Sequence, residues 1–321
     1  MIPVERAHLV IAAATHPGMQ GKPNEDRYSV SAYQFSEDNR AQSVLAILAD
    51  GIGGHRAGEV AAELAVENIS KYVVDFSSNH PVQTLKQAFA LTNQIILDHS
   101  SGDASLAGMG TTCVCAWVIG DQLYATSMGD SRLYLQRGAK SICLTTDHTW
   151  IQEALTQGTL KPEQAPGHPN AHIIRRFLGS PNVVNPDIRL RFNPDDSDAQ
   201  AEANQGLRLV PGDRLMLCTD GLTDLVTDAE IRDILRTCQL DISPTQLINL
   251  ANQRGGHDNI TVVILEVPQP ADNTRPLRIH QKSTSIPTPK VPRTKISWLM
   301  IALLLLAIFL MVLLLIYTFI Q

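Results

Sequence analysis

The stretch ADGIGGHRAGEVAA, residues 49–62, joins a predicted strand to a predicted helix. Residues 44–49 form an apolar run, which predicts a strand. In residues 58–74, apolar side chains recur at three- and four-residue spacing, which predicts a helix with one buried face. The carboxylate of Asp50 is therefore expected at the end of a strand, and the glycine after it lets a backbone carbonyl approach a cation closely.

Apolar, β-rich runs separated by turn residues predict five further strands, and helical spacing predicts two further helices. The strands are residues 112–119, 122–128, 131–136, 214–218 and 260–266, and the helices are residues 81–99 and 228–236. Many of the strands are near neighbours in the sequence, so antiparallel pairing is expected. This order fits an α+β layered domain better than alternating βαβ units. The acidic residues 193–206 are expected to form an exposed loop.

Composition divides the chain of 321 residues into a folded domain over residues 1–267, a Pro/Ser/Thr-rich linker over 268–295 and an apolar segment over 296–320. The formal net charge of −6 gives no basic field, which disfavours nucleic-acid binding. Five cysteines without a CxxC pair favour a reducing cytosol. Of these, Cys113 and Cys115 share one face of a strand and are expected in the core.

The apolar segment over residues 296–320 is expected to be a transmembrane helix. As a helix it is about 37 Å long at ~1.5 Å per residue, against a hydrocarbon core of about 30 Å. Only Gln321 follows it, and Trp298 and Tyr317 lie near its ends, so a single-pass tail anchor is expected. A buried core helix is the alternative, but uncharged apolar runs of this length are rare in soluble cores. The linker contains basic residues, and residues 1–16 carry no secretory signal. Both features predict that the folded domain lies in the cytoplasm.

Acidic side chains gather in five short motifs beside predicted strands. The motifs are Asn24-Glu25-Asp26, Asp50-Gly51, Gly129-Asp130-Ser131-Arg132, Asp220-Gly221-Leu222-Thr223-Asp224 and Gly256-His257-Asp258-Asn259. A single Asp-Gly pair is most often only a turn, but carboxylates at the ends of adjacent strands can converge. Converging anions repel one another unless cations neutralise them, and oxygen ligands suit Mg²⁺ or Mn²⁺ better than zinc. Two such ions about 3.5 to 4 Å apart support in-line displacement at phosphorus, so metal-assisted phosphate hydrolysis is the hypothesis.

The order of these motifs resembles that of the PPM (PP2C-type) Ser/Thr phosphatases, particularly the bacterial members. The motifs that carry the resemblance are NED (24–26), ADGIGGHRAGEVAA (49–62), GMGTT (108–112), GDSR (129–132), TTDH (145–148), TDGLTD (219–224) and GHDNIT (256–261). The resemblance covers essentially the whole folded domain. It implies a four-layer α/β-β/α fold, in which helices flank a central antiparallel β-sandwich. It also implies Mn²⁺ or Mg²⁺ as cofactor, with two catalytic ions and a weaker third.

The resemblance also implies a role for each acidic residue. One catalytic ion is held by Asp50, Asp220 and Asp258, and the other by Glu25, Asp50 and the Gly51 carbonyl. In this scheme Asp50 bridges the ions, and Asp26 orients the attacking water. The residues that match the third ion are Asp130 and Asp224, together with Asp220. The flap of the family would fall at about residues 152–170.

Two departures from the family concern the substrate. Members usually carry an arginine four residues before the motif Glu, to grip the substrate phosphate, and here Gly21 stands at that position. The neighbouring Lys22 is the candidate substitute, as a point charge rather than a bidentate fork. Many eukaryotic members have a histidine after the Asp-Gly pair, where this chain has Ile52. The leaving-group proton then has two candidate sources, water held at the metals and His55.

Other polar side chains are expected to be structural. Arg132 follows an acidic residue and is expected to form an ion pair rather than to bind phosphate. Surface positions are expected for the four histidines His148, His168, His172 and His257.

The leading hypothesis is a phosphatase that acts on phosphoserine or phosphothreonine in the protein substrates of a Ser/Thr kinase at the same membrane. A catalytically weak phosphoprotein-binding scaffold is an alternative, because the arginine is missing at Gly21. The complete set of core carboxylates argues against it. A phosphatase for small phosphate esters is a third possibility, since a metal site does not encode substrate size.

Overall fold

The structure is a computed structural model, and it describes residues 1–35, 41–53, 56–75, 80–182, 185–193 and 195–269. The predicted transmembrane helix over 296–320, most of the predicted linker and His55 lie outside the described residues. No helix within the described ranges is long and apolar enough to cross a membrane.

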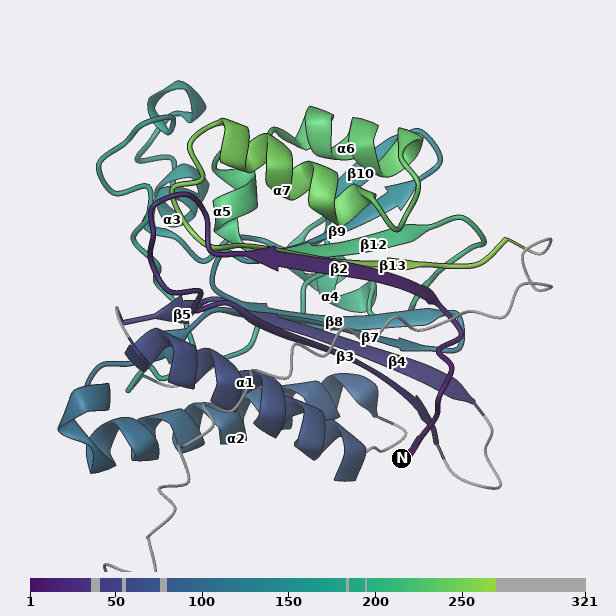
Figure 1. The fold of residues 1–321 in the computed structure, drawn as a ribbon, viewed down its shortest axis with the longest axis horizontal. Coiled ribbons are helices and arrows are strands. Elements are labelled where there is room, and N and C mark those ends of the chain that lie inside the picture. The colour runs from purple at the N-terminus through teal and green to yellow at the C-terminus, as the bar shows by residue number, and fades with distance from the viewer. Residues whose placement is uncertain (36–40, 54–55, 76–79, 183–184, 194, 270–321) are drawn as a thin grey trace, which may run out of the picture. The chain divides into compact units, whose positions relative to one another are not determined.

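Two antiparallel sheets form the centre of the fold (Figure 1). The six-stranded sheet has the order β1 (Ile2–Pro3), β3 (Arg27–Gln34), β4 (Gln42–Ala49), β7 (Cys113–Ile119), β8 (Gln122–Met128) and β11 (Leu207–Arg208). The five-stranded sheet has the order β10 (Lys140–Cys143), β9 (Arg132–Arg137), β12 (Arg214–Cys218), β13 (Ile260–Glu266) and β2 (Val10–His16). A short ladder pairs β5 (Gly51–Ile52) with β6 (Gly110–Thr111).

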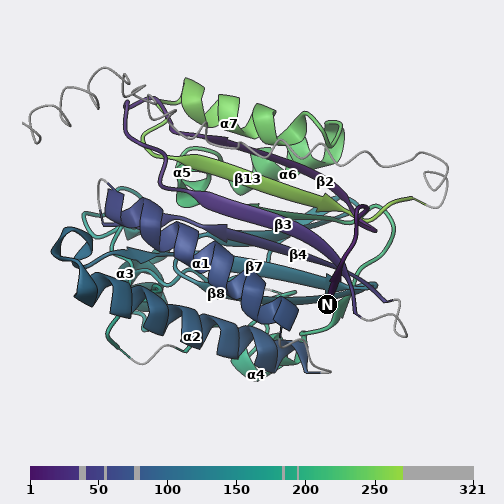
Figure 2. The same ribbon diagram turned by 60° about the horizontal axis from the view of Figure 1, so that its bottom comes forward.

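Helices cover the outer face of each sheet (Figure 2). On the six-stranded sheet, α1 (Arg56–Asp75) packs against β3 and β4, and α2 (Pro81–Gly102) packs against β8. On the five-stranded sheet, α7 (Ser243–Gln253) packs against β13 and β2, and α6 (Asp228–Thr237) packs against β9 and β10. The predicted four-layer α/β-β/α arrangement is therefore confirmed.

Alternation along the strands builds the three apolar layers between these four layers. In β4, Leu45 and Ile47 pack with the helices α1 and α2, whereas Val44, Ala46 and Leu48 face the second sheet. Successive side chains of a strand point to opposite faces, so a strand buried on both faces has a continuous apolar sequence. The same alternation places Cys113 and Cys115 in the core beside α1 and α2, as predicted.

Several elements differ from the sequence prediction. Strands β2, β3 and β10 were not predicted, because their sequences mix polar residues or alanine with the apolar ones. The helix α7 was not predicted either. The exposed loop predicted over residues 193–206 is wrong, since it contains the helix α4 (Asp198–Ala203). Ser197 and Gln200 form a capping box at its start, and Ala201 is fully buried. The burial of Ala201 and the capping box therefore stabilise a helix in this segment despite its acidic composition.

Candidate metal centre

The acidic motifs meet at one end of the two sheets. In the first sheet, Arg27 pairs with Ala49, so Asp26 and Asp50 lie at the same strand ends.

In the second sheet, the last residue of β12, Cys218, pairs with Arg132 of β9 and with Val262 of β13. The residues just beyond these ends are Asp130, Asp220 and Asp258. Antiparallel pairing thus brings together carboxylates that are far apart in the sequence.

Asp26 is almost completely buried. Its Oδ2 atom accepts hydrogen bonds from the hydroxyls of Thr261 at 2.6 Å and Thr219 at 3.1 Å. Its Oδ1 atom is buried and has no hydrogen-bond partner among the described residues. Burial raises the pKa of Asp26 to about 7, and the charges of Asp220 and Asp258 add to this effect. Thr261 and Thr219 therefore bind Oδ2 of Asp26, and Oδ1 of Asp26 stays available for another ligand.

The neighbouring carboxyls show the same pattern. Burial and the nearby acidic side chains raise the pKa of Asp220 to about 8 and that of Asp130 to about 6, and they raise the pKa of Asp50 well above its usual range. The Oδ1 atoms of Asp130 and Asp220 are buried without a partner in the described structure. Converging, unpaired oxygens of this kind fit divalent cations, which would neutralise the charges and accept the free lone pairs.

Backbone contacts fix Asp50 in position. The Thr112 amide at 2.9 Å and the Thr111 hydroxyl at 2.7 Å both donate to the Asp50 carbonyl, and the Asp50 amide donates to the Thr112 hydroxyl at 3.1 Å. The Thr112 hydroxyl also contacts that of Ser131 at 2.7 Å, which joins this strand end to the loop that carries Asp130. Neither threonine was predicted as a site residue, although both belong to the GMGTT motif.

Glu25 is positioned by its backbone amide, which donates to Oδ1 of Asn259 at 2.7 Å. Because Asn259 follows Asp258, this bond ties two predicted ligand motifs together. Lys22 is exposed, and its grip on phosphate stays a prediction. Gly21 has a φ of +70°, a left-handed conformation in which an arginine would be strained.

The residues predicted to be structural divide into two groups. Arg132 donates to both carboxylate oxygens of Asp147, at 2.9 and 2.7 Å, so its predicted role in an ion pair is confirmed. The prediction of a surface position is wrong for His148, which is 4% exposed. Its Nδ1 accepts from the amide of Gly129 at 3.0 Å, and its Nε2 contacts Oδ2 of Asp187 at 3.1 Å. His148 therefore supports the turn that presents Asp130.

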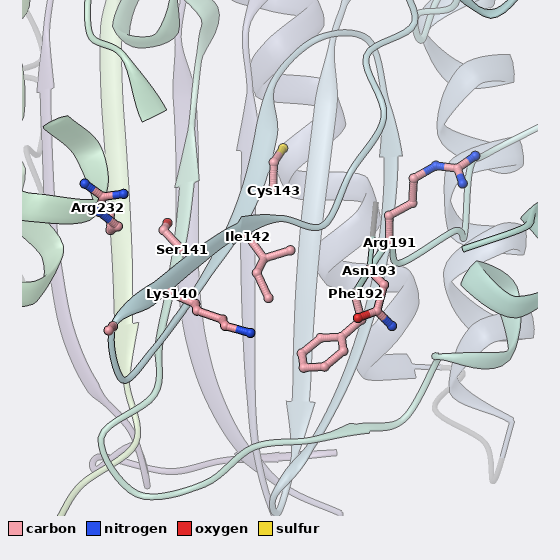
Figure 3. A pocket seen from close by; sticks show the side chains of 9 residues that line it. Lys140, Ser141, Ile142, Cys143, Arg191, Phe192, Asn193 and Arg232 are labelled. Carbon is pink, nitrogen blue, oxygen red and sulfur yellow. The ribbon is translucent and has the colours of Figure 1, made fainter. Parts of the chain in front are cut away.

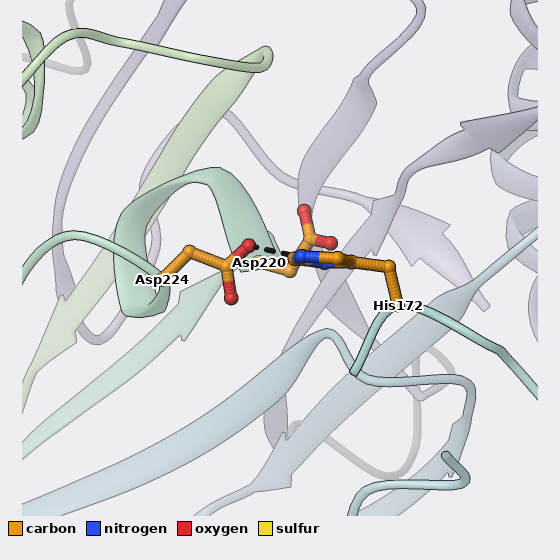
Figure 4. A group of neighbouring side chains, drawn as sticks. All are labelled: His172, Asp220 and Asp224. Carbon is orange, nitrogen blue, oxygen red and sulfur yellow. Dashed lines mark ion pairs between the residues drawn. The ribbon is translucent and has the colours of Figure 1, made fainter. Parts of the chain in front are cut away.

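His172 is exposed, as predicted, and it lies beside two acidic residues (Figure 4). Its Nδ1 is 3.5 Å from Oδ2 of Asp224. One ligand atom each from His172, Asp220 and Asp224 lie within 4.8 Å of one another. The segment before His172, where the flap was predicted, contains α3 (Trp150–Thr156) and a 3₁₀ turn over Pro162–Gln164. No sequence pattern pointed to His172.

A separate pocket of about 570 Å³ contains none of the predicted site residues (Figure 3). It is lined by Ala139, Lys140, Ser141, Ile142, Cys143, Arg191, Phe192, Asn193 and Arg232. None of the carboxylates of the metal centre therefore belongs to this pocket.

Known proteins resemble this chain over most of its length. The family description Protein phosphatase 2C matches residues 16–250. Protein phosphatase PhpP of Streptococcus pneumoniae is 37% identical over 265 residues, which cover 81% of this chain and 98% of that protein. The crystal structure of the serine/threonine phosphatase PstP/Ppp of Mycobacterium tuberculosis has a TM-score of 0.68 and 31% identity, covering 81% of this chain and 99% of that one. The PstP catalytic domain in complex with two manganese ions has a TM-score of 0.66, 31% identity and the same coverage.

Proposed function

The chain belongs to the protein phosphatase 2C family, and from this premise we propose that it hydrolyses phosphoserine and phosphothreonine in proteins with two Mn²⁺ or Mg²⁺ ions. The observation that carries the proposal is the set of buried carboxylate oxygens without partners, on Asp26, Asp130 and Asp220, at one end of the sandwich. Relatives named as protein phosphatases, one of them solved with two manganese ions, support it.

Asp50, Asp220 and Asp258 would hold one ion, and Glu25, Asp50 and the Gly51 carbonyl the other. When bound, such ions act as Lewis acids on the phosphoryl oxygens and lower the pKa of water. The protein contributes fixed positions, since hydrogen bonds to Thr111 and Thr112 hold the backbone of Asp50. These contacts reduce the reorganisation needed when substrate binds.

Asp26 is the proposed acceptor of a proton from the attacking water. Its Oδ2 is held by Thr261 and Thr219, so the unpartnered Oδ1 is the atom that can contact water. The hydroxyls of Thr261 and Thr219 also favour the ionised form of Asp26, which is the form that can accept a proton. Lys22 is the proposed contact to the substrate phosphate.

Hydrolysis of a phosphothreonine peptide by the full chain in Mn²⁺, Mg²⁺ or EDTA tests the proposal. We expect activity only with metal, and a loss of about 100-fold or more in Asp50→Ala and Asp220→Ala, because each removes a metal ligand. The matched control is Asp121→Ala, which removes an exposed aspartate paired with Arg208 and should leave activity unchanged. Turnover in EDTA, or full activity in both ligand variants, would refute the mechanism. A comparison of kcat/KM with that for a small aryl phosphate distinguishes a protein phosphatase from an enzyme for small esters.

We also propose that residues 296–320 anchor the enzyme in a membrane, with the catalytic domain in the cytoplasm and its substrates among the targets of a membrane Ser/Thr kinase. The support is the length and uncharged apolar composition of this segment. Membrane fractionation of the full chain, compared with a chain that ends at Pro268, tests the anchor. Equal recovery of both forms in the soluble fraction would contradict it.

A further inference from the structure

We infer that the free edge of β10 is a docking site for an acidic, extended segment of a protein substrate, which would add to the sheet as a further strand. The inference goes beyond the proposed function, because the segment would bind at a distance from the metal centre. Its place in the fold is the pocket of about 570 Å³ that is lined by residues 139–143, residues 191–193 and Arg232 (Figure 3).

β10 lies at the edge of the five-stranded sheet, and β9 is its only partner among the described strands. The amide of Leu144 donates to the carbonyl of Leu133 at 2.7 Å, so the hydrogen-bonded positions of this antiparallel pair alternate from Leu144 through Ile142. The backbone amides and carbonyls of Ser141 and Cys143 therefore point to the free side of β10. An edge with open backbone groups is a template for pairing with another chain.

The pocket has walls on both faces of this strand. Lys140 and Ile142 extend from one side of β10 toward Phe192, whereas Ser141 lies on the other side with Arg232 of α6 (Figure 3). Ile142 and Phe192 pack against the apolar layer between the two sheets. A strand sends alternate side chains to opposite faces, so a site with walls on both faces suits an extended peptide.

The lining of the pocket is basic. It contains Lys140, Arg191 and Arg232, and it contains no acidic residue. Arg191 is paired with Asp198. Lys140 is exposed and has no ion pair among the described residues, and Arg232 contacts its exposed neighbour Asp233, in a type of ion pair that contributes little energy. Lys140 and Arg232 are therefore available to an acidic segment.

A hydroxyl in the pocket also lacks a partner. The Oγ atom of Ser141 is buried and has no hydrogen-bond partner among the described residues, and a hydroxyl can donate to a carboxylate. The alternation along β10 then predicts the segment. One carboxylate would lie beside Lys140, the next would lie beside Ser141 and Arg232, and an apolar side chain would follow against Ile142. The predicted segment is two consecutive acidic residues next to an apolar residue.

The site is separate from the metal centre. Lys140 pairs with Arg137 at one end of β9, and the residue at the other end, Arg132, adjoins the loop of Asp130. These two ends are about 17 Å apart at ~3.3 Å per residue. A docked segment would therefore raise the local concentration of its protein at the enzyme without contact with the metals.

Fluorescence anisotropy of a labelled peptide that contains Glu-Glu-Val tests binding to the full chain in detergent. We expect binding to the unaltered chain and to the control Lys71→Glu, which makes the same change of charge at an exposed position of α1. The affinity should fall about tenfold or more in Lys140→Glu, because the reversed charge repels the peptide. It should fall similarly in Ser141→Pro, because proline removes an outward amide and is tolerated in an edge strand. A Gln-Gln-Val peptide should bind about tenfold more weakly.

Two further probes separate strand pairing from the binding of a bare anion. A peptide with the same side chains and N-methylated backbone amides should not bind, since it cannot pair with the edge. Inorganic phosphate at the concentration of the peptide should not displace it. Absence of binding to the unaltered chain, equal binding to Lys140→Glu, equal binding of the N-methylated peptide, or displacement by phosphate would each overturn the inference.

Hydrolysis rates measure the consequence for substrates. A phosphothreonine peptide would be joined to Glu-Glu-Val by about 15 Gly and Ser residues, which span roughly 21 Å. Its KM should be about tenfold lower than that of the peptide without the segment, and Lys140→Glu should remove this difference. Equal KM values for the two peptides would contradict the inference. Hydrolysis of a small aryl phosphate should be the same in Lys140→Glu, Lys71→Glu and the unaltered chain, and its absence from all three would overturn the proposed function alone.

Discussion

Gly58, in the first turn of α1, lies so close to Glu25 that a Cβ atom at position 58 would be 2.6 Å from Oε2 of that carboxylate. The same atom would be 2.8 Å from the carbonyl carbon of Gly51. Both neighbours are proposed to hold one metal ion. The start of α1 therefore fits against the metal centre only because residue 58 has no side chain.

Gly58→Ala is expected to displace Glu25 or the backbone of Gly51, because real Cβ contacts do not come as close as 2.6 Å. We expect Mn²⁺ affinity to fall about 10- to 100-fold, and activity at limiting Mn²⁺ to fall with it. Calorimetry measures the Mn²⁺ affinity, and hydrolysis rates at limiting Mn²⁺ measure the activity. The control is Gly102→Ala at the end of α2, where a Cβ would meet nothing within 4 Å. Unchanged Mn²⁺ affinity in Gly58→Ala would contradict this prediction, because it would mean that Glu25 and Gly51 accommodate the added methyl group without loss of metal binding.

Thr261→Val is expected to change the pH profile of activity. Its hydroxyl donates to Asp26 at 2.6 Å and favours the ionised carboxylate, so its removal should raise the pKa of Asp26. A hydrogen bond to a charged group contributes about 1.5 kcal/mol or more, so the acid limb of kcat/KM should move up by about one pH unit. Thr237→Val is the control, because Thr237 is exposed at the end of α6 and its hydroxyl donates to the carbonyl of Asp233, away from Asp26. An acid limb at the same pH in Thr261→Val would argue against Asp26 as the base.

His148→Leu is expected to lower the free energy of unfolding by about 1 to 3 kcal/mol, because it leaves the buried amide of Gly129 without its acceptor. Urea unfolding measures this loss. His99→Leu, at an exposed position of α2, is the control and should change stability by less than about 0.5 kcal/mol. If both variants unfold at the same urea concentration, the contact between His148 and Gly129 contributes little.

The stability of the metal-free protein is expected to fall as the pH rises. The pKa values of Asp26 and Asp220 are raised to about 7 and about 8 in the folded chain. A group with a raised folded pKa stabilises the fold below its unfolded pKa, and this contribution is lost as the pH rises through the folded pKa. Since metal binding displaces these protons, the stabilisation by Mn²⁺ should be larger at about pH 8 than at about pH 6.

Thermal unfolding in EDTA and in Mn²⁺, at about pH 6 and about pH 8, measures how strongly Mn²⁺ stabilises the protein at each pH. Asp121→Ala, which alters only an exposed ion pair, should follow the unaltered chain. An equal shift of Tm by Mn²⁺ at both pH values would contradict a coupling between protons and metal.

The sequence predicted the six strands whose apolar runs are buried, and it missed strands such as β2 and β3. In β3, the sequence RYSVSAYQ contains serine and glutamine, which give a weak strand pattern. Pairing with the neighbouring strand β4 stabilises it. Local propensity describes a strand poorly when pairing partners stabilise it.

For the site, the sequence by itself determined the candidate ligand types and placed four of the five acidic motifs beside predicted strands, because each of these four adjoins an apolar run. The fifth motif, Asn24-Glu25-Asp26, precedes β3, which was not predicted. Only the tertiary structure decided which side chains surround them. The contacts of Gly58 with Glu25, of His148 with Gly129 and of His172 with Asp224 join segments that no local pattern connects. The physical reason is that periodicity reports which face of an element is buried, whereas distances across the end of a sandwich depend on how the whole chain packs.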